Sequence, residues 1–114
     1  MTKSKLLFFV SLFLMATSLQ AQKKMEKRAK KITAEMTEVL DLTKKEAKSV
    51  LEVQMFKLKE GKAIRANYEG DERKAELKKL GNKIYNQMKD ALGGKEKGKS
   101  RLKKWKQHLK NKKQ

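Results

Sequence analysis

The sequence contains no cysteine and no proline, and histidine occurs once, at position 108. Without cysteine there are no disulfide bonds and no thiolate ligands. A protein this small therefore cannot reinforce its core by cross-linking. Transition-metal sites need several nitrogen or sulfur donors, which His108 alone cannot supply, so neither a metal ion nor another cofactor is expected. The absence of proline removes the strongest helix breaker. Because lysine, glutamate, alanine, leucine and methionine abound, the composition predicts an all-α protein.

Acidic residues are also scarce. The chain has 31 Lys and Arg against 13 Asp and Glu, a net charge of +18. Like charges repel one another within a folded chain, so an excess this large lowers stability. We therefore expect the positive charge to serve a function, namely binding an anionic partner. Nucleic acid is the usual expectation for so basic a protein.

The amino-terminal residues argue against nucleic acid, because residues 1–21 have the parts of a cleavable signal peptide. Lys3 and Lys5 precede the apolar stretch 6–16, and small residues follow it. The stretch is shorter than the ~20 apolar residues that span a bilayer. We expect cleavage after Ala21, with a cut after Ser18 as the second option, and no lipid anchor at the junction. The mature domain would be residues 22–114, exported to a bacterial periplasm with a net charge of +16.

Export leaves lipid head groups, lipopolysaccharide and acidic unfolded polypeptides as anionic partners, and no nucleic acid. Basic residues in the first and last predicted helices are the candidate contacts for such partners. They are Lys23, Lys24, Lys27, Arg28, Lys30, Lys31, Arg101, Lys103 and Lys104. Since the core is thin, we also expect the chain to form a homodimer.

Two helices are predicted in the first half of the mature chain. Apolar residues at steps of three and four begin at Met25 and continue to Leu40. Thr43 and Glu46 then form a capping box, with Leu42 placed to pack onto Ala47 as a hydrophobic staple. The second helix starts there, and Val53 and Phe56 lie off its main stripe, which indicates a second apolar contact. Whether Gly61 interrupts this helix stays open.

Two more helices are predicted in the second half. Asp71 is the expected N-cap of the third helix, and Gly93-Gly94 is its expected stop. Residues 95–99 read as a charged linker, and Ser100 as the cap of a short fourth helix. The apolar residues Leu102, Trp105 and Leu109 share one face of this last helix, which forms a basic carboxy-terminal tail.

Residues 93–100 match the phosphate-loop pattern G-x-x-x-x-G-K-S. That loop binds nucleotide only between a buried strand and a helix, whereas the preceding residues 82–92 have helical periodicity. We therefore expect no nucleotide site. No arrangement of nucleophile, base and acid is visible either, and Glu35 and Glu38 lie among lysines, so the chain is not expected to be an enzyme.

The segment Leu42-Thr43-Lys44-Lys45-Glu46-Ala47-Lys48, behind a basic first helix and a signal peptide, resembles the small periplasmic LTxxQ-motif proteins, the Spy/CpxP-like group. Leu92 and Lys104-Trp105 resemble that family's second motif more loosely. Two departures stand out: Glu46 replaces the glutamine of the motif, which still closes a capping box, and the second motif lacks its threonine cap.

The resemblance implies a cradle-like dimer of four antiparallel helices whose basic concave face binds unfolding clients, or an envelope sensor kinase, without ATP. We therefore expect a periplasmic, ATP-independent chaperone-like or envelope-stress protein. The alternatives are an accessory protein that binds polyanions or membrane surfaces through residues 95–114, and an inhibitor of a sensor kinase.

Overall fold

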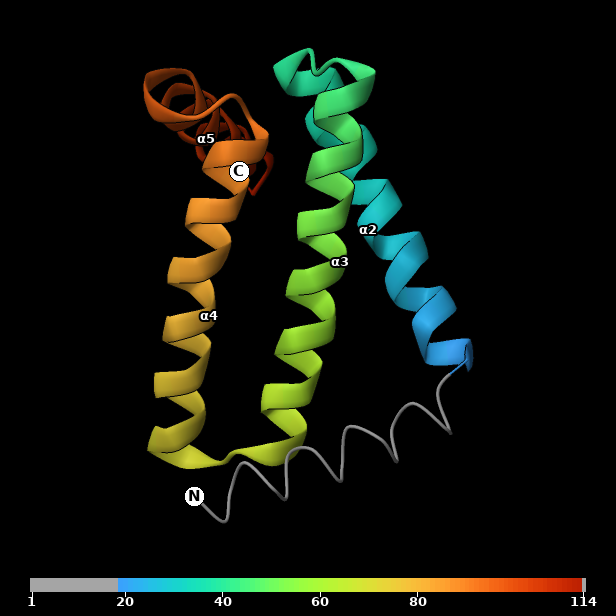
Figure 1. The fold of residues 1–114 in the computed structure, drawn as a ribbon, viewed down its shortest axis with the longest axis vertical. Helices are drawn as coiled ribbons and strands as arrows, with labels where there is room; N and C mark the ends of the chain where they lie inside the picture. The colour runs from blue at the N-terminus through green and yellow to red at the C-terminus, as the bar shows by residue number, and fades with distance from the viewer. Residues whose placement is uncertain (1–18, 114) are drawn as a thin grey trace.

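The computed structural model describes residues 19–113, which form four helices and no strand (Figure 1). They are α2 (Leu19–Leu40), α3 (Lys44–Asn67), α4 (Gly70–Ala91) and α5 (Lys95–Lys112). The all-α prediction is confirmed for this part of the chain. The predicted signal peptide lies outside the described residues except for its last three positions, which fall in the first turn of α2.

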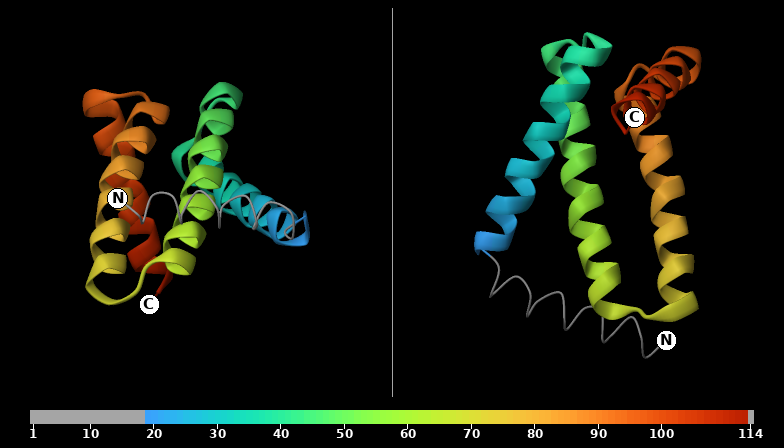
Figure 2. Two further views of the ribbon diagram at one scale, coloured as in Figure 1. Left: turned by 60° about the horizontal axis from the view of Figure 1, so that its bottom comes forward. Right: turned by 180° about the vertical axis from the view of Figure 1, so that it is seen from behind.

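The helices are arranged as a ring of neighbours. Helices α2, α3 and α4 run up, down and up, and α3 packs against α2 on one side and α4 on the other. After α4 the chain turns sharply, and α5 runs across the other helices instead of lying along them (Figure 2). Because α5 contacts both α4 and α2, it closes the ring at one end of the molecule.

The capping box at the start of α3 is confirmed. The Glu46 amide donates to Thr43 Oγ1 at 3.1 Å, and the Thr43 amide donates to Glu46 Oε1 at 3.0 Å. Leu42 is buried in the core and Ala47 packs against the same cluster, as the staple predicts. Helix α3 runs without a break through Gly61, which lies under the Arg65 side chain and close to Leu80.

Two predicted helix starts are wrong. Helix α4 begins at Gly70, and its N-cap is Glu69, whose side chain makes no capping bond. Asp71 lies in the first turn instead, where its charge interacts favourably with the helix dipole. Helix α5 begins at Lys95 after Gly94, so the predicted linker 95–99 is helical and Ser100 is not a cap. Tertiary contacts of Gly98 and Arg101, described below, hold these first turns of α5 in place.

The core gathers at the end of the molecule where α5 crosses. It contains residues from all four helices and from the α2–α3 and α4–α5 connections: Met36, Leu40, Leu42, Val50, Val53, Ile84, Met88, Leu92 and Leu102. Val53 is buried and Phe56 packs against this cluster, which confirms the second apolar contact of α3. Towards the other end, α2 and α3 diverge (Figure 1).

Candidate functional site: a basic hollow between four helices

A hollow of about 780 Å³ extends from the core residues Met36 and Leu102 to Arg65 and Leu77. All four helices line it. Its aliphatic residues are Ile32, Met36, Leu58, Leu77, Leu80, Ile84, Met88, Leu102 and Leu109. Tyr85 and Trp105 add two aromatic rings. The size and the apolar lining are within the range of binding pockets in proteins.

Four cations also line the hollow: Arg28, Lys57, Arg65 and Lys106. No Asp or Glu is among the lining residues, and none of these cations forms an ion pair with a carboxylate anywhere in residues 19–113. Lys106 Nζ lies 5.7 Å from the centre of the Tyr85 ring, a cation–π contact that joins α5 to α4. The positive charge beside the apolar surface is therefore unneutralised.

Two glycines line this space, but the Arg65 side chain covers Gly61, and only Gly81 faces open space. Gly61 of α3 and Gly81 of α4 both line the hollow without a side chain. A Cβ atom at Gly81 would have no neighbour within 4 Å, so a larger residue could stand there. Leu77 and Leu80, on the same helix, stay half-buried. The missing side chain at Gly81 thus contributes to the open space.

The first contact that fixes α5 is a carboxylate at the start of α3. Glu46 Oε2 accepts a hydrogen bond from Arg101 Nη1 at 2.7 Å, and the same nitrogen donates to the Leu92 carbonyl at 3.2 Å. Both charged side chains are less than a fifth exposed. The bond from the Thr43 amide, and then the Arg101 guanidinium, lower the pKa of Glu46. Glu46 therefore caps α3 and anchors α5 with the same carboxylate.

The second contact joins the end of α5 to α2. Glu35 Oε1 lies 2.7 Å from Lys112 Nζ and 3.2 Å from His108 Nε2, while the His108 ring stacks on Trp105. The hydrogen bonds from Lys112 and His108 lower the pKa of Glu35. His108 lies beside Trp105 as expected, although its partner on α2 was not predicted.

The candidate anion-binding residues lie in three different settings. Arg28 lines the hollow, and Arg101 is held by Glu46 inside the fold. The remaining ones are exposed on α2 and α5, away from the lining of the hollow: Lys23, Lys24, Lys27, Lys30, Lys31, Lys103 and Lys104. Of these, Lys30 pairs with Glu26 at 3.2 Å. The structure therefore brings only Arg28 to the hollow.

Sequence reasoning missed Lys57, Arg65 and Lys106 as residues of the hollow. The spacing of Lys57, Gly61 and Arg65 places them on one face of α3, so the helical period alone could have grouped them. The sequence offered no means of knowing that this face turns inward.

The phosphate-loop match has a structural explanation. Residues 82–91 belong to α4 and Leu92 is its C-cap, so no strand precedes the loop. Gly93 and Gly94 have φ of +114° and +72°, a region that favours glycine. A Cβ atom at Gly98 would overlap the carbonyl oxygen of Lys89, so α4 and α5 could not cross as closely. Turn geometry and helix packing thus account for Gly93 and Gly98, the two glycines of the motif, and for Gly94 between them.

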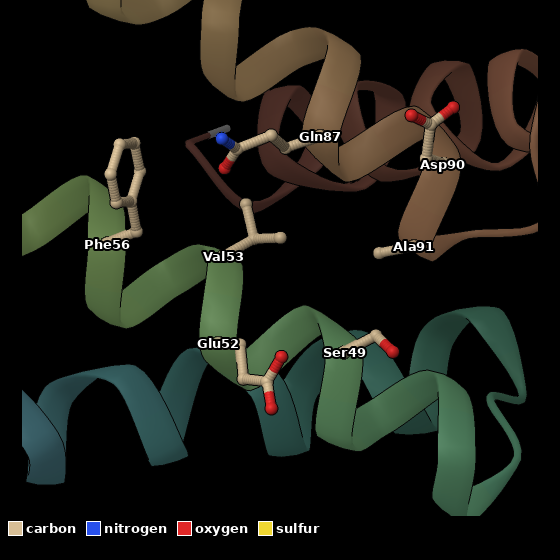
Figure 3. Close-up of a pocket in the computed structure, with 7 residues that line it drawn as sticks. All are labelled: Ser49, Glu52, Val53, Phe56, Gln87, Asp90 and Ala91. Atoms are coloured by element: carbon tan, nitrogen blue, oxygen red, sulfur yellow. The ribbon is translucent and has the colours of Figure 1, made fainter.

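A second hollow, of about 460 Å³, lies between α3 and α4 and has the opposite charge (Figure 3). Its lining includes Glu52 and Asp90 and no basic residue, together with Val53 and Phe56. At 100° per residue, Glu52 lies on the opposite side of α3 from Gly61, and about 140° around the helix from Lys57 and from Arg65. The two charges are therefore separated onto different faces of one helix pair.

Residues 19–113 contain no group of three or more His, Asp or Glu side chains placed to hold a metal ion. Within the same range, no helix is both long and apolar enough to cross a membrane.

Comparisons with known proteins add no assignment. No protein-family model matches the chain, and neither does any curated protein or solved structure.

Proposed function

We propose that this protein is an exported, ATP-independent chaperone-like or envelope-stress protein that holds unfolded acidic polypeptides. The observation that carries the proposal is the hollow, in which an aliphatic lining stands beside four cations and no carboxylate. Long-range attraction would bring an acidic client to this face, as charge complementarity mainly speeds encounter. Weak apolar contacts with the half-buried Leu58, Leu77 and Leu80 would then hold it.

The proposal is tested by measuring aggregation of an acidic, apolar client at increasing salt. The mature form, residues 22–114, should suppress aggregation at low salt and lose the effect as salt screens the cations. The double variant Lys57→Gln/Arg65→Gln should suppress less than the wild type. Its matched control is Lys59→Gln/Lys62→Gln, which removes the same charge from α3 outside the hollow. Suppression that does not depend on salt, or equal loss in both variants, would contradict the proposal.

The second candidate function is attachment to a polyanion or membrane surface through α5. Exposed lysines along this helix favour it, among them Lys103, Lys104 and Lys110. Deleting residues 95–114 would also remove Leu102 from the core, so charge-neutral variants are the better test. The test is co-sedimentation with anionic vesicles, compared between the wild type and the triple variant Lys103→Gln/Lys104→Gln/Lys110→Gln. The second function replaces the first if the triple variant no longer co-sediments and the wild type does not suppress aggregation.

A further inference from the structure

The lining of the basic hollow offers few hydrogen-bond acceptors to a peptide backbone. Its four cations and the Trp105 indole can only donate, so the side-chain acceptors are Gln54 and Tyr85, and the Gln54 amide nitrogen already donates to the Met36 sulfur at 3.4 Å. An extended segment pressed onto the aliphatic surface would bury backbone N–H groups without acceptors, which is unfavourable. A helix carries its own backbone hydrogen bonds. The hollow therefore favours a helical occupant over an extended one.

The length of the hollow also suits a short helix. On α3 the lining residues run from Gln54 to Arg65, and on α4 from Leu77 to Met88. At 1.5 Å per residue, each stretch is about 16 Å long, which corresponds to about three turns of helix. The two walls are antiparallel, and α5 crosses above one end. A helix lying along α3 and α4 would thus contact the half-buried Leu58, Leu77 and Leu80.

Charge decides what kind of helix can lie there. A second copy of this chain, with a net charge of +18, would bring cations against Arg28, Lys57, Arg65 and Lys106. Two such faces packed together would repel one another, so the occupant is not the same face of another copy. Acidic residues flanking an apolar stripe would instead be complementary to these cations.

We propose that the hollow binds a client segment as an amphipathic α-helix of about three turns, with an apolar stripe and acidic flanks. This inference rests on the proposed function and specifies the conformation in which the client is held. Recognition would come from apolar residues at i, i+3, i+4 and i+7, and the flanking carboxylates would lie near the four cations.

The test uses Trp105, the only tryptophan of the chain, as a fluorescent reporter, because it lines the hollow. Two tryptophan-free acidic peptides of about eleven residues are compared, identical in composition. One places leucine at helical spacing and the other alternates leucine with glutamate. The helical-pattern peptide should bind about tenfold more tightly, the factor expected if the other leaves roughly one buried backbone group unpaired. Circular dichroism should show that it gains helix on binding.

Variants locate the binding. Lys57→Gln/Arg65→Gln should weaken the helical-pattern peptide several-fold, whereas Lys59→Gln/Lys62→Gln should change its affinity little. Equal affinity for the two peptides, or no gain of helix, would overturn the inference and leave the proposed function standing. So would binding of dodecanoate, but of neither peptide, by a protein that still suppresses aggregation. If neither peptide binds and aggregation is not suppressed, the proposed function fails together with the inference.

Discussion

The two ends of this molecule are built from the same three long helices and yet differ in how well they are packed. At the end that α5 crosses, Met36 and Leu92 are fully buried, and two carboxylates anchor the crossing helix. At the other end, Leu77 and Leu80 remain half-buried beside unpaired cations. The crossing of α5 thus closes one end of the molecule and leaves the apolar surface at the other end only partly covered.

The largest expected effect is the difference between removing a side chain at the packed end and at the open end. Met36→Ala should lower the free energy of unfolding by about 2–5 kcal/mol, because it leaves a cavity in a closed core. Leu77→Ala should cost about 1 kcal/mol or less, because Leu77 is incompletely buried. Urea denaturation followed by circular dichroism measures both. Equal losses would mean that the open end contributes to stability as a second core.

The crossing of α5 over α4 is tested at Gly98. Gly98→Ala should cost about 1–3 kcal/mol, because the added methyl group would overlap the Lys89 carbonyl and force the helices apart. Ser100→Ala is the matched control, and it should be nearly neutral because Ser100 lies within α5. Thermal unfolding of the two variants distinguishes them. A loss at Ser100 comparable to that at Gly98 would instead favour a helix that starts there.

The capping box should have an intermediate effect. Thr43→Ala removes the hydroxyl that accepts from the Glu46 amide and should cost about 1 kcal/mol. Asp71→Ala, at the residue that the sequence suggests as a cap, should cost only about 0.3–0.5 kcal/mol from its lost interaction with the helix dipole. Chemical denaturation measures the two losses, and the reverse order would restore Asp71 as a cap.

The open end should tolerate a larger side chain at Gly81. Gly81→Ala should stabilise the protein by about 0.5–1 kcal/mol, because alanine is the better helix former and the new methyl group has free space. The bulkier Gly81→Leu should fill part of the hollow and weaken client suppression while the fold persists. Melting temperature and the aggregation assay report these effects separately. Destabilisation by alanine would show that the space is closed in solution.

The smallest expected effect is the pH dependence of the two contacts that hold α5. The pKa of Glu46 is lowered by the Thr43 amide and Arg101, and that of Glu35 by Lys112 and His108. A lowered folded-state pKa gives stability that is present above the ordinary pKa of glutamate and lost as the pH falls through the lowered value. Stability should therefore decline on acidification in that range. In Glu35→Gln/Glu46→Gln the decline should be smaller, and an unchanged decline would assign it to other carboxylates.

Local sequence signals were sufficient where a helix end depends on neighbouring residues. The Thr43–Glu46 box and the Gly93-Gly94 stop are both present, because each is closed by residues that are adjacent in the chain. The same reasoning failed at Asp71 and Ser100. There, short polar residues have the chemistry of a cap, but the helix begins earlier.

By itself, the sequence determined that the protein is all-α and which residues form most of the apolar stripes, because helical period and propensity are local properties. It could also indicate a basic, partly apolar surface. Only the tertiary structure decided that α5 crosses the bundle, that Arg101 is used inside the fold, and that Arg28, Lys57, Arg65 and Lys106 meet at one hollow. These outcomes depend on contacts between residues far apart in the chain, such as Gly98 against Lys89 and Arg101 with Glu46, which no local pattern specifies.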